Sequence, residues 1–256
     1  MNSNKNPRTE ENSQEMVYGL RPLTEAIAAG KEVEKVFLQK GLDSKTFREL
    51  TRLLKNRQIP FQVVPLEKLN RLTRKNHQGV VAYISPIAFY DITQLLPTLY
   101  EKGETPFLLL LDKVTDVRNF GAILRTAESA GVHAVIIPDK GAAQLNAGTI
   151  KSSAGAIFNI PICREHNLKE TLEFIKNSGL RIAAISEKAD KTYFTENLTG
   201  PIALLMGSES EGISPEYLKR ADVHLRIPML GQTASLNVSV ATAILLYETV
   251  RQRLQQ

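Results

Sequence analysis

Apolar runs alternate with polar, glycine-containing segments along most of the chain. In the first third, three short runs rich in β-branched residues are bounded by turn residues and predict strands at residues 33–39, 59–65 and 79–86. Apolar residues at helical spacing predict a helix within residues 44–58, and a shorter helix closed by Gly30 precedes the first strand. Alternating elements of this length indicate a small α/β domain.

From residue 107 the apolar runs are longer and more continuous. FLLLLDKV, which begins at Phe107, is typical of a strand buried on both faces. Further strands are predicted for HAVIIP, AIFNIPI, RIAAIS, IALLMG and HLRIPM. The intervals between these runs contain helical or loop sequence. The sequence therefore predicts an α/β fold with a mostly parallel sheet and layers of helix over it, whose ligands sit at the carboxyl ends of the strands.

The pattern divides the chain into four segments. Residues 1–15 are polar, lack an apolar period and are expected to be a disordered tail. Residues 16–86 form the small α/β domain and residues 106–256 the larger one. Between them, residues 87–105 show no long clean period and are interpreted as a linker with some helix in it.

A helix predicted to begin near Asn119 has an unusual polar face. One side carries the apolar stripe Phe120, Ile123, Leu124, Ala127 and Ala130. The opposite side holds only small residues around Arg125. Small residues around one guanidinium indicate close approach of another surface or a ligand, although a solvated arginine also fits this pattern.

The segment GSESEGISPE follows the predicted strand IALLM. Its two glycines resemble a phosphate-binding loop, but no lysine follows Gly212, and Glu209 and Glu211 would repel a triphosphate. The loop therefore favours an uncharged or cationic ligand. A plain strand-to-helix turn remains the alternative.

The segment LGQTASLN follows the predicted strand HLRIPM. Ser235 is expected to cap a helix that runs to about Arg253. This helix is apolar on nearly every side, which predicts burial by a partner subunit or by its own chain. Asn237 would lie in its first turn, where the side-chain amide can bind a substrate group as well as a backbone group.

Composition excludes several classes of protein. Hydrophobic residues make up 43% and charged residues 23%, as in ordinary globular domains, and no apolar run is long enough to span a membrane. Cys163 is the only cysteine, so no disulfide framework can form within the chain, and the four histidines lack metal-ligand spacing. We expect a cytoplasmic protein without a metal.

The basic excess lies entirely in the first third. Residues 1–90 carry 15 Lys or Arg against 9 Asp or Glu, a net charge of +6, whereas residues 91–256 carry 17 against 18, a net charge of −1. A nucleic acid would use this excess through phosphate contacts. On charge alone, a solvated surface without a partner is equally well supported.

Three segments resemble the signature motifs of the SpoU-type RNA 2'-O-methyltransferases, in the same order and spacing. They are NFGAILRTAESAG, LLMGSESEG and IPMLGQTASLNVSVATAILLYE. KSSAGAIFNIP, from Lys151, is similar to a further segment of that family. VYGLRPLTEAI and NHQGVVAYISP resemble the RNA-binding domain that precedes the catalytic domain in many members. The resemblance extends from Met16 to the end of the chain.

The resemblance implies a SPOUT-type fold, tied in a deep trefoil knot and paired as a homodimer, with S-adenosylmethionine as the cofactor. Backbone contacts to that cofactor are implied for Gly207, Ile227 and Leu236. The implied catalytic residues are Asn119, Arg125, Glu209, Ser235 and Asn237. RNA contacts are expected in the first domain at Arg48, Arg52, Lys55, Arg57 and His77, although a structural role for His77 is an equally good interpretation.

The implied reaction moves a methyl group from a sulfonium to a ribose 2'-hydroxyl, which must be aligned and must lose its proton. An arginine stays protonated in proteins, so Arg125 is expected to hold the adjoining phosphate while a phosphate oxygen or water accepts the proton. Glu209 and Asn237 would orient the ribose. Within the family the resemblance favours a guanosine of 23S rRNA; a tRNA target and a non-catalytic RNA-binding or ribosome-assembly factor are the alternatives.

Overall fold

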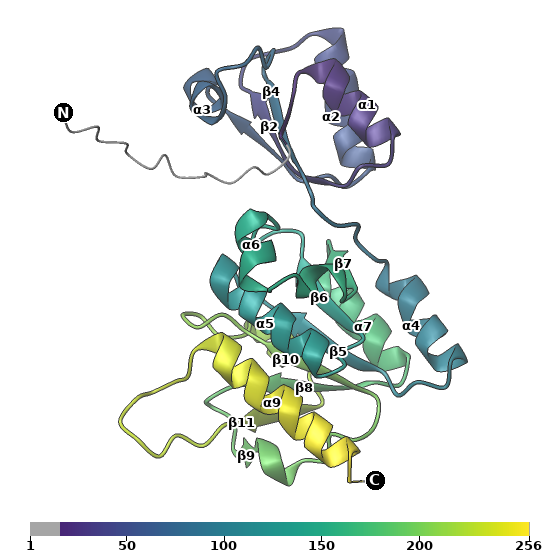
Figure 1. Ribbon diagram of the computed structural model, residues 1–256, viewed down its shortest axis with the longest axis vertical. Helices are drawn as coiled ribbons and strands as arrows, with labels where there is room; N and C mark the ends of the chain where they lie inside the picture. Colours follow the sequence, from purple (N-terminus) through teal and green to yellow (C-terminus); the bar gives the residue numbers. More distant parts are fainter. Residues whose placement is uncertain (1–15, 256) are drawn as a thin grey trace, which may run out of the picture. The chain divides into compact units, whose positions relative to one another are not determined.

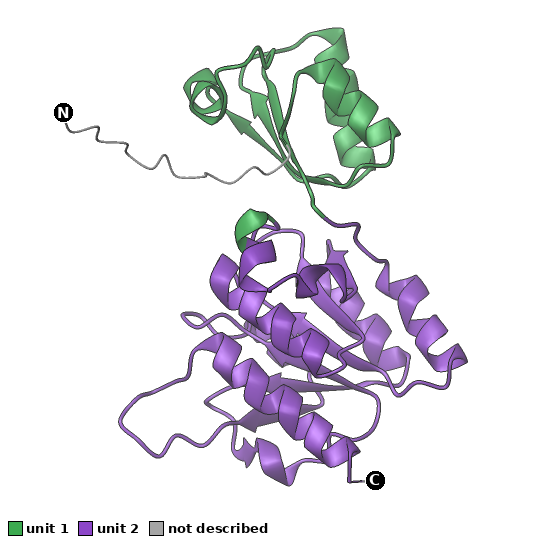
Figure 2. Cartoon of the chain, viewed as in Figure 1, with its two compact units in different colours: residues 1–86, 146–148 green, residues 87–145, 149–256 purple. Residues whose placement is uncertain are grey.

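The computed structural model describes residues 16–255, which form two compact units (Figure 2). One contains the residues up to 86 together with 146–148, and the other contains residues 87–145 and those from 149 onward. The disordered tail predicted for residues 1–15 lies outside the described residues. In the part of the chain that is described, no helix has the length and apolarity needed to cross a membrane.

The first unit is a four-stranded sheet with helices on both faces (Figure 1). Its elements are β1 (Met16–Tyr18), α1 (Leu20–Ala28), β2 (Val33–Gln39), α2 (Lys45–Asn56), β3 (Phe61–Val64), α3 (Leu66–Leu72) and β4 (Val80–Ile84). The strand order is β1-β4-β2-β3, and only β2 and β3 pair in parallel. Side chains alternate along β2, since Val36 and Leu38 pack with α1 and α2 while Phe37 packs with α3.

The second unit contains a seven-stranded sheet in the order β7-β6-β5-β10-β8-β11-β9, and every pair is parallel. Its strands are β5 (Phe107–Leu111), β6 (Ala134–Pro138), β7 (Ile162–Glu165), β8 (Arg181–Ile185), β9 (Lys191–Thr192), β10 (Ile202–Met206) and β11 (Val223–Arg226). Its helices are α4 (Ile92–Glu101), α5 (Val117–Ser129), α6 (Ala147–Ser152), α7 (Leu168–Asn177), α8 (Pro215–Leu218) and α9 (Val238–Arg253), with short 3-10 turns at Ala156–Phe158 and Tyr193–Thr195. The predicted α/β fold with a mostly parallel sheet is confirmed.

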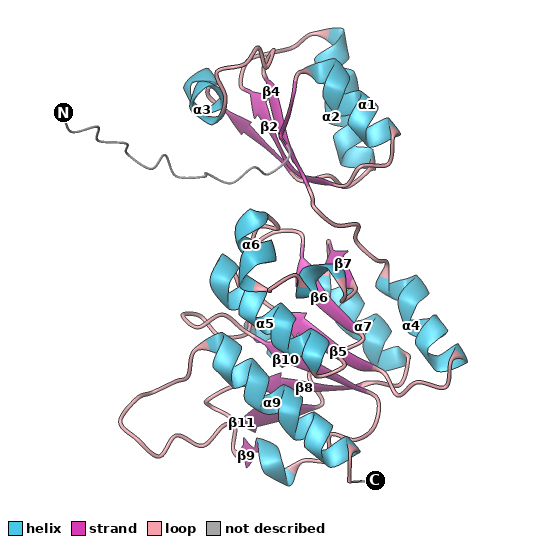
Figure 3. Cartoon of the chain, in the orientation of Figure 1, coloured by secondary structure: helices cyan, strands magenta, loops and turns pink. Residues whose placement is uncertain are grey.

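Helices cover both faces of this sheet (Figure 3). Helices α5 and α9 pack together on one face, and α4 and α7 cover the other. Strand β5 is buried on both sides, because Phe107, Leu109 and Leu111 face α5 and α9 while Leu108 and Leu110 face α4 and α7. The continuous apolar run therefore forms a strand buried on both faces, as the sequence predicted.

One predicted strand is wrong. AIFNIPI does not form a strand: Ala156–Phe158 is a 3-10 turn, and β7 begins only at Ile162. Gly155 has a left-handed backbone with φ of +85°, which starts the turn, and Pro161 lacks the N–H donor that a ladder needs. The trefoil knot implied by the resemblance stays a prediction.

Candidate active site

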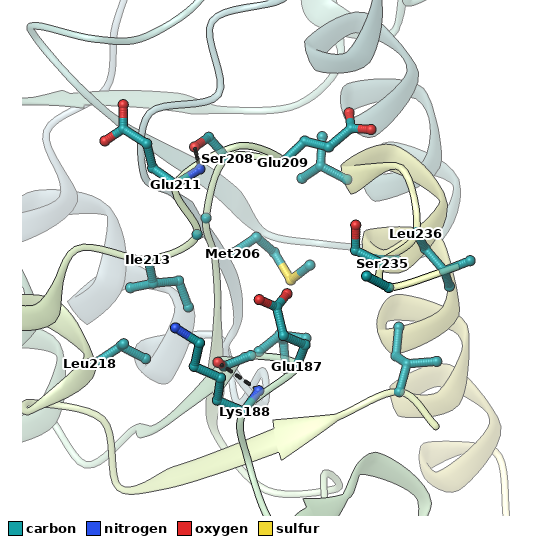
Figure 4. A pocket seen from close by; sticks show the side chains of 18 of the residues that line it. Glu187, Lys188, Met206, Ser208, Glu209, Glu211, Ile213, Leu218, Ser235 and Leu236 are labelled. Atoms are coloured by element: carbon teal, nitrogen blue, oxygen red, sulfur yellow. Dashed lines mark hydrogen bonds between the residues drawn. The ribbon is translucent and has the colours of Figure 1, made fainter. Parts of the chain in front are cut away.

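A pocket lies at the carboxyl ends of β8, β10 and β11, beside the start of α9 (Figure 4). We call it the strand-end pocket. All three residues predicted to contact a cofactor, Gly207, Ile227 and Leu236, line this pocket. Glu209 and Ser235 line it as well. Its place matches the position where parallel α/β sheets bind ligands.

The loop that leaves β10 is folded tightly on itself. A Cβ on Gly207 would lie 2.1 Å from the carbonyl carbon of Gly212, so only glycine fits. Gly212 donates its N–H to the Ser208 carbonyl oxygen at 2.9 Å. Beyond it Ile213 is buried, and Ser214 donates its N–H to Oδ2 of the buried Asp112 at 2.7 Å. The loop is therefore held at both ends.

Asn237 connects the helix start to the predicted catalytic residues. Its Oδ1 accepts hydrogen bonds from the Ser239 N–H at 2.9 Å and the Ser239 hydroxyl at 2.6 Å, which caps α9. Its Nδ2 donates to Oδ1 of Asn119 at 3.1 Å and to Oε2 of Glu209 at 3.4 Å. Three residues from distant parts of the sequence thus meet. The expected cap at Ser235 is wrong, because the helix begins two residues later.

Asn119 is positioned by the first turn of α5. Oδ1 of Asp116 accepts the N–H groups of Arg118 and Asn119, both at 2.9 Å. The hydrogen bond from Asn119 and the weaker one from Arg118 hold the pKa of the Asp116 carboxyl below its ordinary value. The apolar stripe predicted for this helix is buried.

The small face of α5 has a partial structural explanation. A Cβ on Gly121 would lie 1.9 Å from Oγ of Ser152, so α6 approaches the helix there. Arg125 is exposed and does not line the strand-end pocket. Among the described residues its guanidinium forms no hydrogen bond or ion pair. The structure therefore brings Asn119, Glu209 and Asn237 together but leaves Arg125 apart.

The charge of the strand-end pocket restricts its ligand. Its lining includes Glu187, Glu209 and Glu211 but a single lysine, Lys188, among otherwise neutral residues. This excess of carboxylates disfavours a polyphosphate and favours a cationic ligand. Apolar side chains such as Met206 supply a surface for a flat ring system.

Sequence reasoning missed Glu187 and Lys188. Both follow β8, whose carboxyl end opens into the same pocket as that of β10. The signal that could have found them is their position directly after the predicted strand RIAAIS, on the edge of the sheet where ligands were expected.

The basic residues predicted to contact RNA cluster on α2. Arg48, Arg52 and Lys55 line one shallow cavity of about 510 Å³ and are exposed, as is Arg57 at the helix end. Spacings of four and three residues place the first three on one helix face. Arg48 lies 3.6 Å from Asp43, and both side chains are largely exposed, so this pair is weak.

His77 is buried, with 8% of its surface exposed. Its Nδ1 accepts the Gly79 N–H at 3.0 Å, so the proton resides on Nε2, which donates to Oδ1 of Asn70 at 2.9 Å. Both ring nitrogens hold the loop before β4. In the described part of the chain, no group of three or more His, Cys, Asp or Glu residues could hold a metal ion.

Two family models match the chain. The model of the SpoU rRNA Methylase family matches residues 106–247, and a model described as RNA 2'-O ribose methyltransferase substrate binding matches residues 16–90. The first match includes every residue of the strand-end pocket and the hydrogen-bonded group of Asn119, Glu209 and Asn237.

Curated relatives and a solved structure are similar over most of the chain. The 23S rRNA (guanosine-2'-O-)-methyltransferases RlmB of Photorhabdus laumondii and Escherichia coli K12 are 39% and 38% identical, over 93% of this chain and 98% and 99% of theirs. The crystal structure of the SpoU methyltransferase AviRb from Streptomyces viridochromogenes, in complex with its cofactor AdoMet, is 27% identical. It aligns with a TM-score of 0.60 over 94% of this chain and 91% of that chain.

Proposed function

The chain belongs to the SpoU rRNA methylase family, and we propose that it transfers a methyl group from S-adenosylmethionine to the ribose 2'-hydroxyl of a guanosine in 23S rRNA. The observation that carries this proposal is the hydrogen-bonded group of Asn119, Glu209 and Asn237 beside a pocket with excess carboxylates. A binding protein has no need of such an arrangement.

The strand-end pocket fits S-adenosylmethionine by its excess of carboxylates and by its apolar lining. When bound, this cofactor supplies an electrophilic methyl group. The backbone at Gly207, Ile227 and Leu236 would hold it, and Met206 and Ile213 would cover its apolar parts. The carboxylate of Glu187 suits its positive charge and its ribose hydroxyls.

The acceptor ribose would lie against Glu209 and Asn237. The Glu209 carboxylate can accept a hydrogen bond from a ribose hydroxyl, and the Asn237 amide holds that carboxylate in place at 3.4 Å. Oδ1 of Asn119 accepts a second hydrogen bond from the same amide nitrogen, and Ser235 lines the pocket. We assign these four residues to alignment of the hydroxyl, with a phosphate oxygen or water as the proton acceptor.

Arg125 would act from a second copy of the chain. It does not line the strand-end pocket, whereas the exposed Val240 and Tyr247 give α9 an uncovered apolar face next to that pocket. We propose a homodimer that covers this face and brings Arg125 to the phosphate of the nucleotide bound by its partner.

The residues from 16 to 86 would bind the RNA. Arg48, Arg52, Lys55 and Arg57 provide a basic helix face, and His77 holds the loop that ends at Gly79. Replacing the four basic residues by alanine should weaken RNA binding and reduce its salt dependence. An unchanged salt slope would assign RNA binding to another surface. A cytoplasmic location follows from the proposed substrate.

The proposed function is tested by methyl transfer in vitro. Purified full-length protein is incubated with labelled S-adenosylmethionine and separately with unmethylated 23S rRNA, 16S rRNA and tRNA, and the product nucleoside is identified by mass spectrometry. The proposal expects 2'-O-methylguanosine in 23S rRNA. Methylation of tRNA would identify the alternative target, and no transfer to any of them would favour a non-catalytic factor.

Arg125→Ala tests the arrangement across subunits. We expect transfer to fall by on the order of a hundredfold with melting temperature and cofactor affinity unchanged, since one aligning contact is lost. Arg118→Ala, an exposed arginine on the same helix, is the matched control. Mixing the Arg125→Ala and Asn237→Ala proteins should restore activity through mixed dimers. A mixture that stays inactive, or a monomer in light scattering, would contradict the shared site.

A further inference from the structure

A second cavity of about 750 Å³ adjoins the strand-end pocket. We call it the neighbouring cavity. It is lined by residues that follow β5, β6 and β10 and by residues at the starts of α5 and α9. The two cavities share Ser208, Glu209, Glu211 and Val238, so they meet along that loop. Asn119 lines only the neighbouring cavity.

Five charged side chains line the neighbouring cavity, and three of them already form an ion pair or hydrogen bonds within the protein. Nζ of Lys113 lies 2.6 Å from Oε2 of Glu211, a contact that raises the pKa of the lysine. Asp116 accepts two N–H groups of α5, which leaves little of that helix start for an external anion. The two remaining charges are those of Glu209 and Lys140.

The Lys140 side chain has no hydrogen-bond or ion-pair partner within the described residues. It lies two residues after the end of β6, is exposed, and forms no hydrogen bond or ion pair among those residues. Among the described residues, the Glu209 side chain is held only by the 3.4 Å contact from Asn237. The cavity thus presents one available cation, Lys140, and one available carboxylate, Glu209. Only Glu209 also lines the strand-end pocket.

One cation and one carboxylate in the same cavity match the chemistry of a nucleotide in an RNA strand. Its phosphate requires a cation, and its ribose hydroxyls require an acceptor. We propose that the neighbouring cavity receives the nucleotide to be methylated, with Lys140 contacting a backbone phosphate of the RNA in the same subunit that binds the cofactor. This inference rests on the proposed function. Lys140 would add a phosphate contact to the one assigned to Arg125.

The orientation of the nucleotide follows from the shared wall. Glu209 lines both cavities, so a ribose against it has its hydroxyls directed toward the strand-end pocket. Lys140 belongs to the neighbouring cavity alone, so the phosphate lies on the side away from the cofactor. A lysine acts here as a point charge without base preference, which places sequence recognition elsewhere.

The test compares Lys140→Ala, Lys140→Arg and Lys140→Glu with the wild type in the full-length protein. Lys102→Ala is the matched control, because Lys102 is exposed in the same unit and lies outside both cavities. RNA affinity is measured by filter binding of a 23S rRNA fragment at several salt concentrations. Affinity for S-adenosylmethionine is measured by calorimetry, and folding by thermal melts.

Lys140→Ala should weaken RNA binding about tenfold, as expected for loss of one charge-assisted contact. It should also reduce the slope of log K against log salt by about one. Lys140→Arg should bind nearly as the wild type, Lys140→Glu should be weaker than the alanine variant, and cofactor affinity should not change. If Lys140→Ala has the same RNA affinity and the same salt slope as Lys102→Ala, the inference is overturned. The proposed function would still stand as long as the wild type methylates RNA. A wild type that neither binds nor methylates RNA would overturn both.

Discussion

Gly207→Ala is expected to damage both the stability and the cofactor affinity of the protein. The added methyl group would lie 2.1 Å from the carbonyl carbon of Gly212, 2.2 Å from the nitrogen of Ile213 and 2.4 Å from the Gly212 oxygen. All three are backbone atoms, which cannot rotate away as a side chain can. The loop cannot shift freely, because Ile213 is buried and the Ser214 N–H is bonded to Asp112.

The size of the effect follows from this geometry. Overpacking a well-packed interior typically costs 1–3 kcal/mol, and contacts with fixed backbone atoms at such distances place the variant near the upper limit, about 3 kcal/mol. For a chain of this length that loss lowers the melting temperature by roughly 6–12 °C. Displacement of the loop also moves the backbone that lines the strand-end pocket, so cofactor affinity should fall at least tenfold.

Calorimetric unfolding and titration with S-adenosylmethionine measure the two effects. Gly200→Ala is the matched control, since no atom lies within 4 Å of its added methyl group and its backbone is not left-handed. The control should stay within about 0.5 kcal/mol of the wild type. If Gly207→Ala melts with the control and binds the cofactor equally well, the loop is not packed as described and the reasoning fails.

Three further predictions concern other parts of the second unit. Burial alone raises the pKa of Glu196, but the hydrogen bonds from Lys191 and Arg181 outweigh it and hold that pKa below the ordinary 4.5. The Glu196 carboxylate therefore contributes to the free energy of unfolding above pH 4.5, and this contribution is lost as the pH falls below 4.5. Glu196→Gln should lower the free energy of unfolding by about 1 kcal/mol at pH 7, a small value because both cations stay half exposed. In urea titrations its stability should also fall less steeply with decreasing pH than that of the wild type. Burial raises the pKa of the Cys163 thiol to about 12, so a thiol reagent at pH 8 should label it only in denaturant; rapid labelling of the native protein would contradict its burial. Gly121→Ala should destabilise by about 1–2 kcal/mol in chemical denaturation despite the better helix propensity of alanine, because the new methyl group meets Ser152; a more stable variant would refute the contact.

The sequence predicted most of the elements because burial leaves a regular pattern. Strand β2 begins and ends at the predicted residues, and the apolar stripe of α5 is buried as expected. The same criterion failed for AIFNIPI, where a left-handed glycine and a proline decide the backbone and the apolar residues serve a turn. Apolar character alone does not separate these cases.

The candidate site was predictable where a residue's position next to a strand end or a helix start indicated its role. Gly207, Glu209 and Asn237 follow strands or begin a helix, and the structure places them together. Local sequence does not decide whether Ser235 or Asn237 caps α9, because both residue types are good N-caps. The path of the loop from β11 decides where the helix starts. Glu187 depends on the strand order, because β8 is adjacent to β10 only through the topology of the sheet.

The cap of α9 fixes which way the Asn237 carboxamide faces. Its oxygen must meet the Ser239 N–H, so a rotation by half a turn would set two donors against each other. The nitrogen is consequently directed at Asn119 and Glu209 before any ligand arrives. Folding of the helix thus pre-organises a polar group for binding, and little rotational entropy remains to be lost when cofactor and RNA enter.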